Sequence, residues 1–379
     1  MGHFFLNLFV ASILIAPGNS LLRVITFSLC MIANIKKLRF PSERFFLVVV
    51  FFVILFLSIA TVHIRGINYD MNFIVMYLLN FIMLGIFFID PTKINMLPGL
   101  NIANVFIICS TFLYILLVSS FPALEPFFLT SLKGIFLGVP GEKGVLFWSR
   151  TSVFHVASPI LVFSLALVWY KYLVKKRIKY LLYAFAVFLG LIFSGTRANS
   201  FSAVLIIFFI YLHYILFVKK RMLQTVFYAI IAGSLALVGT YLLLIDMNSS
   251  SIAKTGHLYS YIELFNNNIS YFLFGQGVGA YFFTSGFNRE ATLTELSYLE
   301  LIRMFGIFST IVIIFFYIIP FLKYIKFNSP IFFSIGIAYL AYLFIAGTNP
   351  LLIGRTGFIA MWIAYTLPIY QKKSLIIKY

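Results

Sequence analysis

The sequence predicts an all-α, polytopic integral membrane protein with about twelve transmembrane helices, and three observations lead to that fold class. Hydrophobic residues make up 62% of the 379 residues, charged residues only 10%, and the mean hydropathy is +1.04. A soluble domain carries about 25% charged residues. The apolar runs approach the ~20 residues of a membrane helix, whereas barrel strands would alternate over about 10 residues. We therefore expect one membrane domain over 1–379 and exclude soluble, disordered and nucleic-acid-binding proteins.

Turn-forming and charged residues separate the apolar runs and define the expected helices in order. The first two helices are short and are divided by Pro17-Gly18-Asn19-Ser20. The expected spans are 3–16, 20–36, 44–63, 71–89, 101–120, 151–170, 179–195, 199–218, 223–245, 294–320, 330–347 and 353–370. Two further segments are polar enough to leave the bilayer core: 121–150, expected as an outer loop, and 246–293, expected as a long extracytoplasmic loop between helices nine and ten.

The Lys and Arg residues of the loops predict the orientation of the chain. Of these 28 residues, 18 fall in one set of alternating loops and 9 in the other, with Arg303 inside a span. Because cytoplasmic loops carry the excess of positive charge, we expect both termini in the cytoplasm and both long loops outside. Most of the net charge of +18 is then explained by the basic residues that orient the chain in the membrane. The expected location is the cell inner (cytoplasmic) membrane.

The outward basic residues differ in kind from the cytoplasmic ones. The cytoplasmic set has 14 Lys and 4 Arg, whereas the outward set has 6 Arg and 3 Lys. Arginine presents a planar fork that grips phosphate at two points, so an arginine-rich outer rim favours an anionic lipid headgroup such as a diphosphate. Interfacial snorkelling and pairing with acids is the alternative for any single residue. The outward arginines singled out are Arg65, Arg150, Arg197 and Arg355 near helix ends and Arg289 in the long loop.

Arg197 stands between two spans that have almost no connecting loop. One helix is expected to end at Gly195 and the next to begin near Ser200. The backbone N–H groups at that second N-terminus would be free to bind an anion beside the Arg197 guanidinium. A packed tight turn explains Gly195 equally well, but it does not require an arginine.

Acidic residues near the outer end of the tenth span are candidates for chemistry. Glu300 and Arg303, three residues apart, can compensate each other's charge. Glu295 would share a helix face with Tyr298 and Ile302, and it has no obvious local partner except Arg289. Glu295 is therefore the better catalytic candidate, because charged groups near a span normally face a protein cavity.

The long loop contributes weaker signals. Glu290 and His257 could each accept a proton, although a lone histidine is more often a hydrogen-bonded structural residue. Gly275, Gly277 and Gly279 do not have the spacing of a dinucleotide-binding turn. We expect these glycines to let the loop backbone turn close to the membrane surface. Cys30 and Cys109 lie in apolar runs, and no Cys/His cluster has metal-ligand spacing, so we expect no metal and no cofactor.

Three short motifs resemble a known family. They are Ser194-Gly195-Thr196-Arg197-Ala198, Phe274-Gly275-Gln276-Gly277-Val278-Gly279, and Glu295-Leu296-Ser297-Tyr298-Leu299-Glu300-Leu301 leading to Gly306-Ile307. Their order, their spacing and the long outer loop between them are similar to the polysaccharide polymerases of O-antigen and capsule assembly (the Wzy family), to which the O-antigen ligases are related. The ligase branch usually has a histidine where Glu295 stands, so the resemblance favours a polymerase.

The resemblance implies a metal-independent glycosyltransferase at the outer face of the membrane. The donor would be a glycan on undecaprenyl diphosphate, and the acceptor another lipid-linked repeat unit in lipopolysaccharide or capsule biosynthesis. Arg197 and Arg289 would stabilise the leaving diphosphate. Arg65, Arg150 and Arg355 are further candidates for binding it. Glu295 would accept the proton of the acceptor hydroxyl, and Glu290 or His257 is the second candidate for this role. A flippase and a chain-length regulator would be partners.

Two alternatives remain open from the sequence. One is an O-antigen ligase, and the other, from a different class, is a flippase or transporter of lipid-linked oligosaccharides. A flippase should carry charges in the middle of several spans and show two related halves. Midspan charge is nearly absent here, and the long outer loop belongs to one half only.

Overall fold

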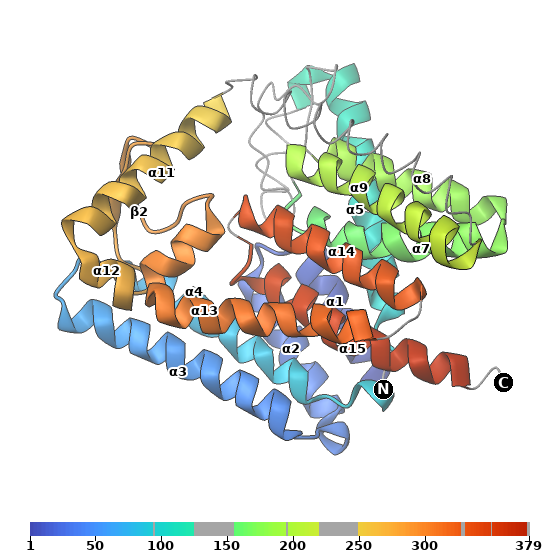
Figure 1. Ribbon diagram of the computed structural model, residues 1–379, viewed down its shortest axis with the longest axis horizontal. Coiled ribbons are helices and arrows are strands. Elements are labelled where there is room, and N and C mark those ends of the chain that lie inside the picture. Colours follow the sequence, from blue (N-terminus) through green and yellow to red (C-terminus); the bar gives the residue numbers. More distant parts are fainter. Residues whose placement is uncertain are drawn as a thin grey trace.

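The computed structural model describes residues 1–93, 95–124, 155–194, 196–219, 249–326, 330–349 and 351–376. Within these residues the fold is a helical bundle with one small β-hairpin (Figure 1). The helices are α1 (Gly2–Ile15), α2 (Ser20–Ala33), α3 (Ser42–Ile64), α4 (Met71–Ile82), α5 (Leu97–Ser120), α7 (Leu161–Lys175), α8 (Ile178–Phe193), α9 (Arg197–His213), α11 (Ser249–Asn267), α12 (Ile269–Phe274), α13 (Ser297–Lys326), α14 (Pro330–Gly347) and α15 (Arg355–Ile376). The strands are β1 (Phe282–Thr284) and β2 (Arg289–Ala291).

The predicted spans correspond to helices wherever the structure describes them. Span 223–245 and the first residues of span 151–170 lie outside the described residues, as does most of the expected outer loop 121–150. Seven helical stretches are long and apolar enough to cross a membrane, and α1, α2 and α8 are shorter apolar helices. This is the architecture of a multi-pass, all-helical membrane protein.

The first two helices form the expected hairpin, but they are short. Each has 14 residues, which corresponds to about 21 Å against a bilayer core of about 30 Å. Asn19 caps α2, because its side chain accepts a 3.0 Å hydrogen bond from the Leu22 N–H. On the neighbouring helix, Asn7 Oδ1 accepts a 2.7 Å bond from the Gly99 N–H at the start of α5. The Asn7 bond therefore fixes the middle of α1 against the start of α5.

Helix α14 lies against α9 in antiparallel orientation. The rings of Phe201 and Phe344 are 5.9 Å apart, and those of His213 and Phe333 are 3.9 Å apart. The start of α9 therefore lies beside the end of α14. Helix α9 continues into a π-helical turn, Tyr214–Val218.

Helix α13 differs from the uninterrupted span expected over 294–320. It begins at Ser297, and Gly306 breaks it with a left-handed backbone (φ 77°, ψ 164°). A Cβ atom at Gly306 would lie 2.3 Å from the carbonyl oxygen of Leu273, at the end of α12. Only glycine allows this contact, so residues 297–305 form a separate short helical segment that holds Glu300 and Arg303.

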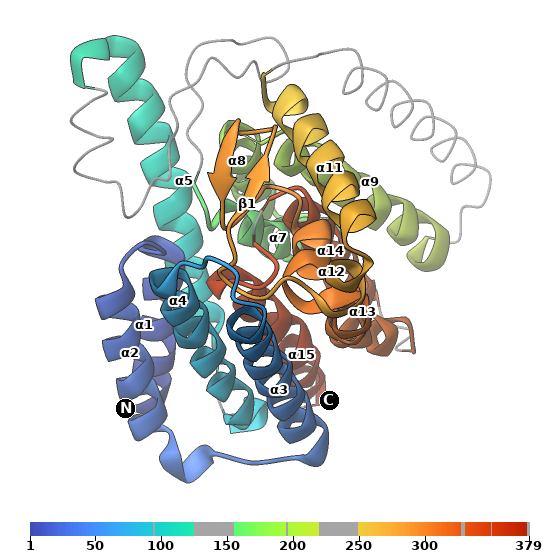
Figure 2. The same ribbon diagram turned by 90° about the vertical axis from the view of Figure 1, so that its left-hand side faces the viewer.

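The segment expected as a long loop is instead an ordered structure, here called the cap (residues 249–296). It consists of α11, α12, a glycine-rich turn and the antiparallel hairpin, with Phe282 opposite Ala291 and Thr284 opposite Arg289. The all-α fold class is confirmed, but the sequence did not reveal this small hairpin within the expected loop, because its strands are only three residues long. Figure 2 looks onto the cap, with β1 and α11 beside each other.

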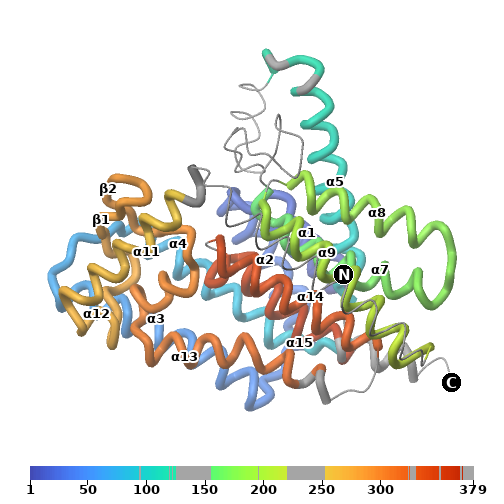
Figure 3. Tube along the Cα trace, turned by 45° about the horizontal axis from the view of Figure 1, so that its top comes forward, coloured from blue at the N-terminus to red at the C-terminus, as the bar shows by residue number. Residues whose placement is uncertain are grey.

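Backbone bonds join the cap to the bundle. The Asp70 N–H donates to Gly279 O at 2.9 Å, and the Tyr281 N–H donates to Asn68 O at 3.0 Å. The cap therefore covers the link between α3 and α4. The N-terminus and the last turns of α15 lie toward the other end of the bundle (Figure 3).

Candidate functional site

A buried ion pair lies directly beneath the cap. Glu300 and Arg303, one turn apart at the start of α13, are 3% and 0% exposed. Arg303 Nε donates to Glu300 Oε2 at 3.2 Å, and Nη2 contacts the other carboxylate oxygen. The compensated pair expected from the sequence is thus present. Such a pair is stable inside a protein only when further hydrogen bonds satisfy its remaining groups.

Arg303 makes those further hydrogen bonds to residues of the cap. Its Nη1 donates to Gln276 Oε1 and to Ala280 O, both at 2.9 Å, and Nη2 donates to Thr292 O at 2.8 Å. The guanidinium also lies 4.4 Å from the ring centre of Phe282. A single side chain from α13 therefore holds the glycine-rich turn, the hairpin and the segment after the hairpin.

A hydrogen bond from α11 satisfies the Glu300 carboxylate in the same way. The Tyr261 hydroxyl donates to Glu300 and lies 2.6 Å from Thr294 Oγ1. Burial raises the pKa of Tyr261 far above its ordinary value, so this hydroxyl keeps its proton and remains a donor. The network links α11 to α13 through Glu300.

The three alternating glycines let the cap approach the bundle, whereas the sequence predicted that they turn the loop backbone close to the membrane surface. Gly275, Gly277 and Gly279 have φ angles of 83°, 109° and 82°. Added Cβ atoms would lie 2.6 Å from Met304 O, 2.7 Å from Val62 Cβ and 2.9 Å from Ile74 Cγ1, respectively. Each glycine therefore packs on a different helix (α13, α3 and α4), so their role is close packing and not phosphate binding.

Glu295 does not lie where the helix pattern predicted. It precedes α13, so it shares no helix face with Tyr298 or Ile302. Its carboxylate is 3.8 Å from Lys254 Nζ of α11, and the side chain is 34% exposed. The expected partner, Arg289, instead lies 5.7 Å from the ring centre of Phe287. Glu295 is thus an accessible carboxylate on the cap.

The other cap candidates divide into exposed and buried groups. Arg289 and Glu290 are exposed on β2. His257 is buried, and its Nδ1 lies 2.6 Å from Thr284 Oγ1 while its ring packs edge-on against Phe287. Burial lowers the pKa of His257, and the charges of nearby Glu295 and Glu300 offset only part of that effect. His257 therefore holds the hairpin to α11 in its neutral form.

Arg197 is the first residue of α9, three residues earlier than the expected start near Ser200. Helix α8 ends at Phe193, before Gly195, which lies outside the described residues. Thr196 caps α9 and accepts a 3.1 Å bond from the Asn199 N–H, so one N–H group expected to be free is occupied. Arg197 itself is half-buried at this N-terminus.

The remaining arginines lie at other helix ends. Arg65 ends α3, where Nη2 donates to Ser270 O at 3.3 Å and the guanidinium lies 4.8 Å from the ring centre of Tyr271. Arg355 is the first residue of α15 and is half-buried. Arg150 lies outside the described residues. Arg65 thus contacts the cap, whereas Arg355 lies in a helix of the bundle.

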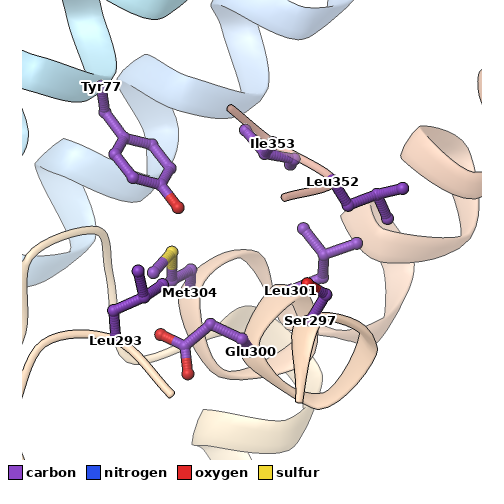
Figure 4. Close-up of a pocket in the computed structure, with 8 residues that line it drawn as sticks. All are labelled: Tyr77, Leu293, Ser297, Glu300, Leu301, Met304, Leu352 and Ile353. Atoms are coloured by element: carbon purple, nitrogen blue, oxygen red, sulfur yellow. The ribbon is translucent and has the colours of Figure 1, made fainter. Parts of the chain in front are cut away.

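A small pocket opens between α4, the start of α13 and the segment before α15 (Figure 4). It is lined by Tyr77, Leu293, Ser297, Glu300, Leu301, Met304, Leu352 and Ile353. The enclosed space has room for about one water molecule, so this pocket is far smaller than a ligand site of about 300–1,000 Å³. The sequence did not single out Tyr77, because an isolated tyrosine in an apolar span carries no motif.

Within the described residues, no three or more His, Cys, Asp or Glu side chains gather as a metal ion would require. Comparisons with protein-family models, with curated proteins and with solved structures found no match. The groups available for chemistry at the capped end are thus an accessible carboxylate, several guanidinium groups and the hydroxyls of the pocket.

Proposed function

We propose that the protein is a polysaccharide polymerase that joins undecaprenyl-diphosphate-linked repeat units into O-antigen or capsular polysaccharide. The observation that carries the proposal is the convergence of the three motifs. They are spread over residues 194–307, and contacts through α14 and α13 bring them to the same end of the bundle.

Helix α14 connects the first motif to the third. The Tyr298 hydroxyl donates to Leu343 O at 3.0 Å, and the Ser297 hydroxyl contacts Asn349 O. On its other side, the end of α14 packs against the start of α9 through Phe344 and Phe201. Arg197 and Glu295 therefore belong to segments that adjoin the same helix end.

The second motif is bonded to the third. Besides the bond between Gln276 and Arg303, the Ser58 hydroxyl accepts from the Val278 N–H at 2.9 Å and donates to Met304 O at 2.7 Å. A rigid connection between the glycine-rich turn and α13 would fix the position of Glu295, which lies between them in the chain.

The membrane arrangement supports the same proposal. We propose twelve crossings with both termini in the cytoplasm, the cap outside, and the chain in the inner membrane. The N-terminus and the last turns of α15 lie away from the cap (Figure 3), and the turn between α7 and α8 at the far end carries exposed Lys175, Lys176 and Arg177. This distribution agrees with an excess of positive charge in cytoplasmic loops.

The proposed reaction needs no metal. The bond between the anomeric carbon of the donor glycan and a diphosphate oxygen breaks, and the diphosphate leaves with the electron pair. The acceptor hydroxyl oxygen bonds to that carbon and transfers its proton to the Glu295 carboxylate, which Lys254 orients. Arg197 and Arg289, with Arg65, Arg150 and Arg355 in reserve, stabilise the negative charge that grows on the diphosphate.

A ligase would use the same outer-face chemistry, so the second candidate from a different class is a flippase. Its coupling charges would be expected near the bilayer midplane. The buried pair Glu300 and Arg303 instead lies in the first turns of α13 and is committed to the cap. This position favours the polymerase.

The test is deletion of the gene followed by gel analysis of cell-surface glycans and complementation with variants. A polymerase deletion leaves a glycan with a single repeat unit. Untransferred lipid-linked polymer would indicate a ligase, and repeat units retained on the cytoplasmic side would indicate a flippase. Complementation with Glu295→Ala should give normal protein levels in the membrane but no long chains.

A further inference from the structure

The cap exposes a row of large apolar side chains on α11. Ile252, Tyr259 and Ile262 are exposed, and their spacing places them on one face of the helix. Leu258, also exposed, lies one turn before Ile262. Single exposed apolar residues are ordinary on a protein surface, whereas a continuous group marks contact with a membrane or with another protein. The outer face of α11 is therefore a contact surface.

The hydrogen-bonding side chains of α11 face the protein instead. His257, Ser260 and Tyr261 are buried, and each hydrogen-bonds to the hairpin or to α13. A surface helix of a soluble domain normally has the opposite arrangement, with apolar residues inward and polar residues outward. Thr255 and Glu263 are also exposed, and α11 is not among the helices that are apolar enough to cross a membrane. This combination suits the membrane interface better than either water or the hydrocarbon core.

The next helix, α12, joins this surface to the lipid-facing side of α13. Phe274, the last residue of α12, is 60% exposed, and its ring centre is 6.4 Å from that of Phe308. Phe308 lies in a stretch of α13 that is long and apolar enough to cross a membrane, and exposed Ile311 and Phe315 follow it at helical spacing. Exposed apolar side chains of such a span face lipid. Phe274 therefore lies at the edge of a lipid-covered surface.

The other neighbour of α12 is the end of α3. Arg65, which follows exposed Ile64 at the end of α3, donates to Ser270 O and lies over the ring of Tyr271. Arginine and tyrosine combine an apolar body with a polar tip, and both are common where a helix leaves the bilayer. Figure 1 shows α12 beside this end of α3. Helix α12 is thus at the level of the membrane surface.

Charge does not explain how the cap would be held at that surface. Anionic headgroups attract clusters of Lys and Arg. The sequence of the cap contains two basic and three acidic residues: Lys254, Arg289, Glu263, Glu290 and Glu295. Because the net charge of the cap is slightly negative, its apolar side chains must supply the attraction to lipid.

We propose that α11 and α12 form an interfacial anchor, which inserts the exposed apolar side chains of the cap among the lipids at the membrane surface. The occupant of this face is lipid, because the face continues onto the lipid-facing side of α13. Since Lys254 lies on α11, the anchor also keeps its partner Glu295 near the lipid headgroups. The inference requires a multi-pass membrane protein and does not depend on the glycan chemistry.

The test measures the surroundings of spin labels on the full-length protein in nanodiscs of phosphatidylcholine. Each label is attached to one introduced cysteine in a Cys109→Ala background, because Cys109 is exposed whereas Cys30 is buried. The anchor variants are Ile269→Cys and Phe274→Cys, both at exposed positions of α12. The matched control is Phe283→Cys: Phe283 is 57% exposed in the same cap, but it lies opposite Glu290 in the hairpin. Collisions with oxygen, which concentrates in lipid, are compared with collisions with a water-soluble nickel chelate.

We expect the ratio of oxygen to nickel collisions to be severalfold higher for Ile269→Cys and Phe274→Cys than for Phe283→Cys. Equal ratios at the three positions would overturn the anchor. Few collisions with either reagent at the two α12 positions would show that protein, such as a second copy of the chain, covers the face, and would overturn the assignment to lipid. Added phosphatidylglycerol should leave the ratios unchanged, and insertion only in its presence would overturn the apolar mechanism. These measurements use no glycan assay, so they stand apart from the deletion test of the proposed function.

Discussion

The two ends of the bundle both carry many basic residues, but they hold them differently. In the turn between α7 and α8, Lys176 is exposed and its Nζ lies 5.3 Å and 5.5 Å from the ring centres of Tyr172 and Tyr214. At the capped end, Arg303 and Arg23 are buried and donate hydrogen bonds to fixed acceptors. An exposed lysine contributes only its charge, whereas a buried guanidinium depends on the geometry of its partners. Substitutions should therefore have much larger effects at the capped end.

The largest effect is expected from Arg303→Met. Removal of the guanidinium leaves the buried Glu300 carboxylate uncompensated, which typically costs about 3–5 kcal/mol. We expect a large fall in the thermal unfolding midpoint and in the yield of folded protein. The double variant Glu300→Gln/Arg303→Met should be less destabilised, because no lone charge remains.

The matched control at the opposite end is Arg39→Met. Arg39 is 65% exposed where it pairs with Asp90 at 3.0 Å, and Asp90 keeps its bonds from Thr92. Asp90 is only 4% exposed, so the loss should exceed that of a fully exposed pair, but the bonds from Thr92 should keep it below the loss expected for Arg303→Met. Equal losses for Arg39→Met and Arg303→Met would contradict the distinction between the two ends.

The next effect concerns the glycine-rich turn. Gly277→Ala places a Cβ atom 2.7 Å from Val62 Cβ at a positive φ, so backbone strain of about 1–3 kcal/mol adds to a steric clash. Gly66→Ala has a similar positive φ but no atom within 4 Å, so it should show the strain alone. The unfolding midpoints of the two variants check this difference, and a milder effect for Gly277→Ala would show that the cap is not packed on α3.

A smaller change in stability should depend on pH. Burial holds the pKa of His257 below its unfolded value, so below about pH 6.5 the unfolded state binds more protons and stability falls as pH decreases. The loss can reach at most about 1.4 kcal/mol per pH unit. Hydrogen exchange of the hairpin amides between pH 7.5 and 5.5 would measure it. His257→Gln should remove this dependence, and acid-induced protection would contradict it.

The smallest effect on stability is expected from Lys254→Met. Its ion pair with Glu295 is one-third exposed and 3.8 Å long, so its loss should cost less than about 1 kcal/mol. If Lys254 orients the catalytic carboxylate, chain length in the glycan gel should nevertheless shorten. Normal chains with Lys254→Met would remove Lys254 from the proposed mechanism.

The sequence predicted what depends on local patterns. Apolar runs located the helices, and Gly275, Gly277 and Gly279 predicted a turn of the loop backbone, although close to the membrane surface and not against other helices. The sequence could not identify which helices these glycines meet, because two of the three contacts join residues more than 200 positions apart, as between Gly277 and Val62. For the same reason it gave Glu295 the partner Arg289, nearby in the chain, whereas the structure pairs it with Lys254.

The hairpin was missed although its turn carried a signal. Ser285-Gly286-Phe287-Asn288 combines turn-forming residues, and Asn288 has a positive φ of 51°. The strands are short and β2 has two consecutive charged residues, Arg289 and Glu290, so no alternating pattern develops.

The most direct test of the central claim is the glycan ladder of a deletion strain complemented with Arg197→Gln or Arg177→Gln. Both variants remove one positive charge, one at the start of α9 near the cap and one in the exposed turn at the opposite end. We expect a single-repeat glycan with Arg197→Gln and a full ladder with Arg177→Gln, at equal protein levels in the membrane. A full ladder with Arg197→Gln would contradict the assignment of this end to substrate.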